Sequence, residues 1–282
     1  MTRLAALAGR IDAWGPQATG STRAVALMRI GLGCIALVRF GDELAPYLMA
    51  TLPGLVLGLA FFFFAACTIL GIRARSSAAA LGGTILTLYL LARHGMAMPG
   101  WSHHHVYLLA VALILLSLTD CGRSLSVDRM RALAAAGGAA PPPERGALLG
   151  QKLIALQLAA LYFWTAVDKT DWAFISGQRL EQTFTWVYSG RALEVLLQMP
   201  WLLAAASIIV LVVEYWLAVA ILMPKWRRAA ILVGLSLHAT FYLMLPVNTY
   251  SVTVIVLYLA LLDPAAVHRF IDRMLGQTEP AR

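Results

Sequence analysis

Charged residues are scarce in this sequence of 282 residues: only 13% are Asp, Glu, Lys or Arg, whereas 60% are hydrophobic. A soluble domain of this size could not keep so much apolar surface away from water, so the composition excludes a soluble globular fold. Acidic residues are the rarer charge, with 14 against 22 Lys and Arg, which gives a formal net charge of +8. Because the basic residues lie between apolar runs, we attribute this charge to membrane orientation and expect no nucleic-acid partner.

Cysteine and export signals are also nearly absent. The three cysteines, Cys34, Cys67 and Cys121, fall inside apolar runs or at a predicted cytoplasmic end, so we expect no exported disulfide framework. The first residues contain no uninterrupted apolar core followed by a small-residue cleavage site, so we expect no removable signal peptide and assign 1–23 to an N-terminal interfacial segment. No cofactor fingerprint or peptide-recognition domain is present, so motifs alone name neither a substrate nor an oligomeric state.

Long apolar runs dominate the rest of the chain. A helix crosses a hydrocarbon core of about 30 Å at about 1.5 Å per residue, so each run of suitable length is a candidate span. Such runs lie near 24–43, 53–72, 77–94, 104–119, 151–170, 201–223, 229–245 and 250–263. We therefore predict an all-α polytopic transmembrane helix bundle of about eight spans. Seven or nine spans remain alternatives, because several runs are short and the last is compatible with a tilted or re-entrant segment.

The basic residues predict the orientation of these spans. With the N-terminus inside, sixteen Lys and Arg residues fall on the cytoplasmic side and four on the opposite side. This positive-inside bias favours an even number of crossings, with both the N-terminus and the C-terminus in the cytoplasm.

Composition also divides the predicted transmembrane domain, 24–264. The segment 134–146 is rich in Ala, Gly and Pro and predicts a flexible cytoplasmic linker between two halves, 24–133 and 147–264. Beyond them, apolar residues recur at helical spacing with arginines between, which predicts a C-terminal cytoplasmic interfacial helix and tail over 265–282.

Ionisable side chains within apolar runs are the candidate functional residues, because each is costly in lipid. Residues 153–167 supply only about 22 Å of helix, which draws Lys169 into the outer part of the membrane. By the same count, the histidine run 103–105 begins the fourth span at a similar depth. We predict an outer cavity rich in cationic and imidazole groups. An alternative is that Lys169 snorkels to the surface or pairs with Asp168 or Asp171.

Two further ionisable residues lie deeper. Glu214 and His238 are each about ten residues from the nearest predicted cytoplasmic loop, which places both near the midplane. A carboxylate there requires a partner, so we predict a structural intramembrane pair between them rather than a proton relay. Three consecutive histidines point in different directions around a helix, so 103–105 cannot all be ligands of one metal. The soft and imidazole groups of His94, Met96, Met98 and His103 leave a copper site as an alternative, but we assign no metal.

Three segments carry a resemblance to a known family. They are SHHHVYLLAVALILLSLTDCGRSLSVDR (102–129), QLAALYFWTAVDKTDWAFISGQRL (157–180) and LHATFYLMLPVNTYSVTVIVLYLALLDP (237–264). The sequence resembles the HTTM family, bacterial membrane proteins similar to the membrane domain of vitamin K-dependent gamma-carboxylase. The similarity runs from about Arg29 to Pro264, with the three segments in the family's order.

The resemblance implies roles for particular residues. Lys169, within Asp168-Lys169-Thr170-Asp171-Trp172, matches the carboxylase lysine proposed as the catalytic base. His105, followed by Val106-Tyr107-Leu108, looks like the carboxylase histidine implicated near the active site. With these two as catalytic candidates, we expect quinol-binding contributions from the surrounding cationic, imidazole and indole side chains. These are Arg93, His104, Trp164 and Trp172.

The implied activity is base-driven proton abstraction, epoxidation or carboxylation by a membrane enzyme that uses a reduced naphthoquinone, vitamin K or a related menaquinol. Oxygen and carbon dioxide are the implied co-substrates. The implied partners are the lipid bilayer, the lipid-soluble quinol and a small peptide or protein substrate. The implied location is the bacterial cytoplasmic membrane, with the site facing the periplasm. The alternative is a non-catalytic membrane module or transporter that assists maturation or export of a partner.

Overall fold

The computed structural model describes residues 19–48, 51–139 and 142–276, and most of them are helical. The chain divides into two compact units. Unit 1 comprises Met1–Ile154 with Leu262–Arg282, and unit 2 comprises Ala155–Leu261. The boundary falls inside helix α7 (Leu149–Asp168), not at the 134–146 segment expected to separate two halves.

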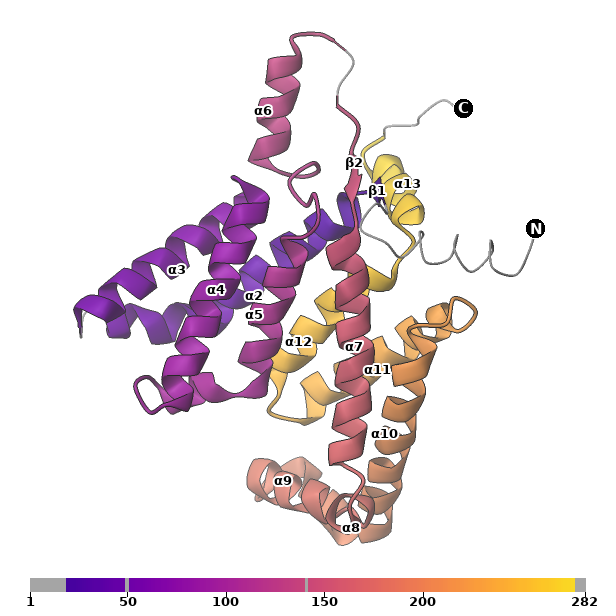
Figure 1. The fold of residues 1–282 in the computed structure, drawn as a ribbon. Coiled ribbons are helices and arrows are strands. Elements are labelled where there is room, and N and C mark those ends of the chain that lie inside the picture. The colour runs from indigo at the N-terminus through magenta and orange to yellow at the C-terminus, as the bar shows by residue number, and fades with distance from the viewer. Residues whose placement is uncertain (1–18, 49–50, 140–141, 277–282) are drawn as a thin grey trace, which may run out of the picture. The chain divides into compact units, whose positions relative to one another are not determined.

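Unit 1 contains four long helices. They are α2 (Arg23–Leu48), α3 (Leu52–Leu70), α4 (Ala74–Arg93) and α5 (His104–Leu116). Helix α2 packs on α3, α3 on α4, and α4 on α5, as Figure 1 shows. The 3-10 helix η1 (Pro99–Ser102) connects α4 to α5. Thr51 caps the start of α3 through a hydrogen bond from the Gly54 N–H, and Gly71 ends that helix in the left-handed region at φ 70°.

Arg29 holds the end of α3 in place. Its side chain is fully buried and donates to the backbone carbonyls of Thr68, Ile69, Cys121 and Leu125. The last carbonyls of a helix have no partner within the helix, so the guanidinium satisfies groups that burial would otherwise leave without a hydrogen bond. The arginine that the sequence places inside the first span is therefore a packing element of unit 1.

The 134–146 segment, expected to be a flexible linker, is partly regular. Helix α6 (Val127–Ala136) includes its first residues, and strand β2 (Arg145–Ala147) begins at its end and pairs antiparallel with β1 (Thr19–Ser21). Glu144, just before β2, accepts from Arg23 Nε at 2.6 Å. Arg23 also pairs with Asp272 of α13 (Pro264–Met274). These buried ion pairs join three distant parts of the chain.

Unit 2 is built from the rest of α7 and from several other helices. These are α8 (Trp172–Ile175), α9 (Gln178–Tyr188), η2 (Ala192–Gln198), α10 (Pro200–Ala220), α11 (Arg227–Met244), α12 (Asn248–Leu257) and η3 (Tyr258–Leu261). Helix α10 packs on α11 and α11 on α12, while α8 and α9 contact α10. Short helices thus fill 172–198.

Each of the eight predicted spans overlaps a helix, but fewer of these helices are long and apolar enough to cross a membrane. Among the described residues, the helices long and apolar enough are α2, α3 and α10. A fourth span is possible if Asn248–Leu261 and Pro264–Met274, which are bent by 102°, act as one. The chain is therefore a helical membrane protein with several apolar helices, and the eight crossings and their orientation stay predictions.

The two predicted interfacial segments have different outcomes. Residues 1–18 of the N-terminal segment lie outside the described residues. At the other end, α13 buries Val267 and Asp272 against unit 1 and exposes Phe270 and Met274. Exposed apolar side chains on a helix that packs on its other face are also typical of a helix lying at a membrane surface, and the interfacial placement of 265–282 stays a prediction.

Candidate functional site

The strongest candidate site in unit 2 is built on an ion pair between Lys169 and Glu214. Lys169 follows the last residue of α7, and its Nζ donates to Oε1 of Glu214 in the second half of α10. The Glu214 side chain is 2% exposed, whereas that of Lys169 is 23% exposed. The carboxylate is thus enclosed by protein while the amine stays partly accessible, and Lys169 Nζ also lies 5.7 Å from the centre of the Phe174 ring.

The two acidic neighbours of Lys169 in the sequence have other partners. Asp171 caps α8 by accepting from the Phe174 N–H at 2.9 Å, and its second oxygen pairs with Arg179 at 2.6 Å. Asp168 is largely exposed and lies 4.0 Å from the same guanidinium. The alternative that Lys169 pairs with either aspartate is therefore wrong, since its carboxylate partner is Glu214.

Next to this pair, a buried hydrogen-bonded chain links three helical elements. Tyr162 of α7 bonds through its hydroxyl to His238 Nε2 of α11 and to the hydroxyl of Tyr258 of η3, both at 2.8 Å. All three side chains are buried. Tyr162 precedes Lys169 by seven residues, two turns of helix, so both side chains project from one face at the end of α7.

Gly234 allows the close packing of the hydrogen-bonded side chains of Tyr162, His238 and Tyr258. It precedes His238 by one turn on α11, and a Cβ at this position would collide with the hydroxyl and ring of Tyr258. The absent side chain therefore lets the tyrosine hydroxyl approach the α11 backbone closely.

Two buried polar atoms at the site have no hydrogen-bond partner among the described residues: Glu214 Oε2 and His238 Nδ1. Thr165 lies near the carboxylate, but its single hydroxyl proton is donated to the Tyr162 carbonyl at 3.2 Å. The charge of Lys169 acts electrostatically on His238, and that of Glu214 acts on Tyr162, so the ion pair and the hydrogen-bonded chain belong to one neighbourhood. Unpartnered buried acceptors are costly, which points to a ligand or water that meets them.

The structure changes the predicted pairing of Glu214 with His238. The two residues are buried in unit 2, as their depth in the sequence indicated, but the partner of Glu214 is Lys169 and that of His238 is Tyr162. Tyr162 and Tyr258 were not predicted as site residues, because tyrosines in apolar runs are typical of membrane interfaces. The spacing of Tyr162 before Lys169, and of Gly234 before His238, was the available signal.

The two tryptophans predicted to bind the quinol are not packed inside unit 2. Trp164 and Trp172 are 65% and 79% exposed. In a membrane protein such exposed indoles contact lipid or the membrane interface, and their part in binding a quinol stays a prediction.

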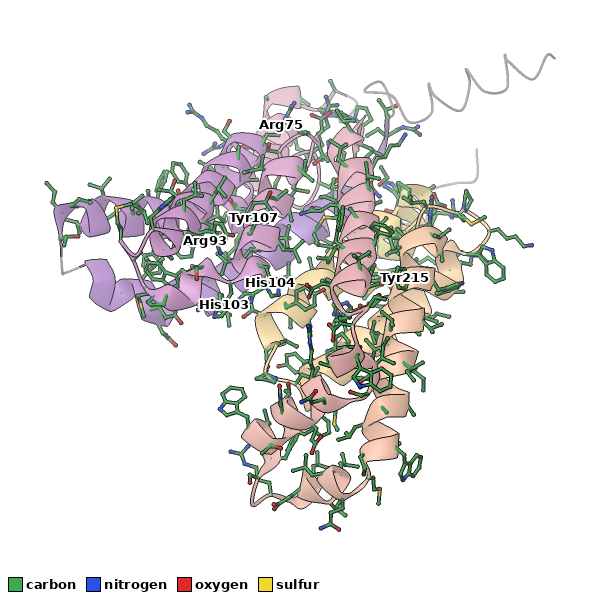
Figure 2. The ribbon with its side chains drawn as sticks, turned by 60° about the horizontal axis from the view of Figure 1, so that its bottom comes forward. Arg75, Arg93, His103, His104, Tyr107 and Tyr215 are labelled. Atoms are coloured by element: carbon green, nitrogen blue, oxygen red, sulfur yellow. The ribbon has the colours of Figure 1, made fainter. Side chains whose placement is uncertain are left out.

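The other predicted site residues belong to unit 1. His103 precedes α5 and its ring stacks on that of His105 at 5.3 Å. His104 and Arg93 are exposed, and His105 is half-buried. Figure 2 shows His103 and His104 in the same part of this unit as Arg93. Nearby, Arg39 pairs with Glu43 at 2.7 Å, and Glu43 also accepts from the indole N–H of the buried Trp101.

No group of three or more His, Cys, Asp or Glu side chains is placed to hold a metal ion within the ranges that the structure describes. The residues with unusual burial are instead suited to proton transfer and hydrogen bonding. Lysine, carboxylic acid, imidazole and phenol all exchange protons and recognise hydroxyl groups.

The apolar helices and the buried ionisable cluster define a helical membrane protein with a polar site in its interior. The family model described as the HTTM domain matches residues 25–265, and the chain belongs to this family. Comparison with curated proteins and with solved structures finds no match. The family match covers both units and agrees with the resemblance seen in the three sequence segments.

Proposed function

We propose that this HTTM-family protein is a membrane enzyme in which Lys169 acts as a base toward a lipid-soluble quinol. The observation that carries the proposal is the contact between a partly accessible lysine and a buried carboxylate. The proposed reaction class is that of the vitamin K-dependent carboxylases, which the family resembles: oxygen-dependent epoxidation of the quinol, coupled to proton abstraction or carboxylation.

A lysine acts as a base only after it loses a proton, and Glu214 offers a route for that loss. Transfer of the Nζ proton to Oε1 converts an ammonium and a carboxylate into a neutral amine and a neutral acid. Burial favours the neutral pair because desolvating two charges costs more than desolvating two dipoles. The partial exposure of Lys169 then leaves its amine open to a substrate.

The donor and acceptor set fits a hydroxyl-bearing ligand. Glu214 Oε2 and His238 Nδ1 are buried acceptors that have no hydrogen-bond partner among the residues that the structure describes. When Nε2 carries the imidazole proton and donates it to Tyr162, Nδ1 is free to accept, and Tyr258 completes the chain behind Tyr162. A bound reduced naphthoquinone would supply hydroxyl protons and the electrons for reaction with oxygen. The protein's residues would orient the quinol hydroxyl, exclude water from it and move its proton.

The remaining assignments rest on the family resemblance. His105 is proposed to act in catalysis, and His104, Arg93, Trp164 and Trp172 to contribute to quinol binding. Carbon dioxide and a small peptide or protein are proposed as further substrates. We place the protein in the bacterial cytoplasmic membrane with Lys169 toward the periplasm, as the basic residues predict.

The test is turnover by purified full-length protein in lipid nanodiscs, supplied with reduced vitamin K under air. We expect oxygen-dependent conversion of the hydroquinone to its epoxide, loss of this activity in Lys169→Ala, and partial rescue by a small exogenous amine. Lys225→Ala is the matched control, because Lys225 is an exposed lysine of the same unit. Normal turnover by Lys169→Ala, or no oxidation of hydroquinone by the wild type, contradicts the proposal.

The second candidate is a non-catalytic membrane module or transporter. The same ion pair favours it, because a charged Lys169 held by Glu214 is a stable structural link. A dedicated partner that copurifies with the protein, without quinone and without turnover, supports this function.

A further inference from the structure

Unit 1 contains a cavity that is independent of the site proposed above. Its volume is about 590 Å³, and it lies among the turn before α4, the 120–123 turn, helix α6 and the residues after that helix. We call it the arginine cavity, because four of its lining residues are arginines: Arg73, Arg75, Arg123 and Arg129. Figure 2 shows Arg75 away from the histidines and Arg93 at the other end of α4.

The two carboxylates that line the arginine cavity are already engaged by the protein. Asp128 accepts from the backbone N–H groups of Arg73 and Ala74 at 3.0 and 2.9 Å, so it caps the start of α4. Asp120 accepts from the Ala147 N–H at 2.9 Å and also pairs with Arg75 and Arg123. Four guanidinium groups against two carboxylates leave the cavity with an excess of positive charge.

Two of the arginines have donors that the protein does not use. The structure gives the Arg73 guanidinium no partner among the described side chains and carbonyls, although its backbone is held at φ 46° beside Asp128. Arg129 is largely buried; it donates to the Pro142 carbonyl, and its Nε makes no hydrogen bond within the described residues but lies 3.6 Å from Glu144 Oε1 as an ion pair. The Arg73 guanidinium is therefore the one with all its donors available to an anionic ligand, and Arg129 adds positive charge to the cavity wall.

We propose that the arginine cavity binds the phosphate group of an anionic phospholipid. Guanidinium groups recognise phosphate through paired N–H donors, which suits a concave site with several arginines. The site lies at the start of α4, just after the end of the apolar helix α3, where headgroups of a bilayer would lie. The basic residues predict this side to be cytoplasmic, and basic pockets on that side of a membrane protein attract anionic headgroups. Free inorganic phosphate carries the same chemistry, and the experiment separates the two sources.

The experiment uses delipidated full-length protein in detergent, titrated separately with dioleoylphosphatidylglycerol, dioleoylphosphatidylcholine and inorganic phosphate. Native mass spectrometry counts bound lipid, and thermal unfolding gives the stabilisation. We expect the phosphatidylglycerol to bind and raise the Tm, with little effect of the zwitterionic lipid. The double variant Arg73→Gln/Arg123→Gln should bind the anionic lipid about tenfold more weakly. Arg131→Gln, an exposed arginine of α6 outside the cavity, should bind like the wild type.

Two further variants keep the result interpretable. Arg73→Gln alone removes a guanidinium that has no partner within the described ranges, so it serves if the double variant does not fold. Arg73→Lys retains the charge but loses the paired donors, so its binding should fall between that of the wild type and that of Arg73→Gln. In another outcome, inorganic phosphate stabilises the wild type as strongly as the lipid does and loses this effect in the same variants. That result would show that the arginine cavity is an anion site for a soluble phosphate and not for a lipid. Equal binding of both lipids, or unchanged binding in Arg73→Gln, overturns the proposal.

Discussion

Lys169 and Glu214 are 45 residues apart in the sequence, yet their side chains form an ion pair in which the carboxylate is buried and the amine is partly open. Breaking such a pair from one side leaves an uncompensated charge inside the protein. The loss in the free energy of unfolding when one partner is replaced can therefore be predicted independently of any proposed reaction.

We expect Lys169→Met to lower the free energy of unfolding by about 2–4 kcal/mol, less than for a completely buried pair because the lysine is partly exposed. The double variant Lys169→Met/Glu214→Leu should recover part of this loss, since neither charge remains. A double-mutant cycle followed by thermal unfolding in detergent should give a coupling energy of about 1–3 kcal/mol. Additive effects of the single variants would show that the two side chains do not interact.

Tyr162→Phe should be more destabilising than Tyr258→Phe. Tyr162 bonds to both His238 and Tyr258, so its loss leaves two buried groups without their partner, at about 1–3 kcal/mol each. Loss of the Tyr258 hydroxyl leaves only one. Thermal unfolding of both variants tests the order, with Tyr242→Phe as an exposed control on α11. A larger destabilisation by Tyr258→Phe would show that Tyr258, rather than Tyr162, is the central residue of the hydrogen-bonded series.

Gly234→Ala should destabilise unit 2, because the added methyl group collides with Tyr258. A glycine to alanine change within a helix otherwise gains up to about 1 kcal/mol. Gly83→Ala is the matched control: Gly83 lies within α4, where a Cβ meets nothing within 4 Å. The midpoint of thermal unfolding should fall for Gly234→Ala and stay level or rise for Gly83→Ala. A rise for both would mean that Tyr258 moves away without cost.

Membrane orientation is tested by single cysteines in a variant without Cys34, Cys67 and Cys121. Ser189→Cys and Ala139→Cys are suitable because both positions are exposed, and because the glycines beside them have φ values of +73° and +92°, which disfavour substitution. In intact cells, an impermeant maleimide should label position 189 and leave position 139 unlabelled. Labelling at position 139 from outside would show that the protein has the opposite orientation to the predicted one.

The native Cys121 also gives a simple expectation. Burial raises the pKa of its thiol, so less of the reactive thiolate is present at neutral pH. With Cys34 and Cys67 replaced by serine, the folded protein should react slowly with a maleimide, and unfolding in detergent should release the thiol. Rapid reaction of the folded protein would show that the 120–123 turn opens readily.

Much of the secondary structure followed from the sequence. The run 53–72 becomes α3 and the run 201–223 becomes α10, because long apolar segments in lipid satisfy their backbone groups most directly as helices. The partial order of 134–146 did not follow. Its Ala, Gly and Pro content favours disorder, but Glu144 is held by Arg23, and β2 pairs with a strand more than a hundred residues earlier.

At the candidate site, the depth of each ionisable residue along its helix was easier to predict than the side chain that it contacts. Counting residues along each run placed Lys169, Glu214 and His238 away from water, because the rise of a helix is constant. That count gives position along the helix axis only. The side chain that each one meets depends on how neighbouring helices are rotated and how closely they approach, and Gly234 shows that one missing Cβ decides such an approach.

The sequence by itself therefore determined that this protein is helical, that it belongs in a membrane, and which ionisable residues are exceptional. Only the tertiary structure decided that Lys169 meets Glu214 rather than its neighbouring aspartates, and that His238 bonds to a tyrosine. The physical reason is that the energy of a lone ionisable group in an apolar run depends on local composition. The energy that selects its partner arises from packing between segments far apart in the chain.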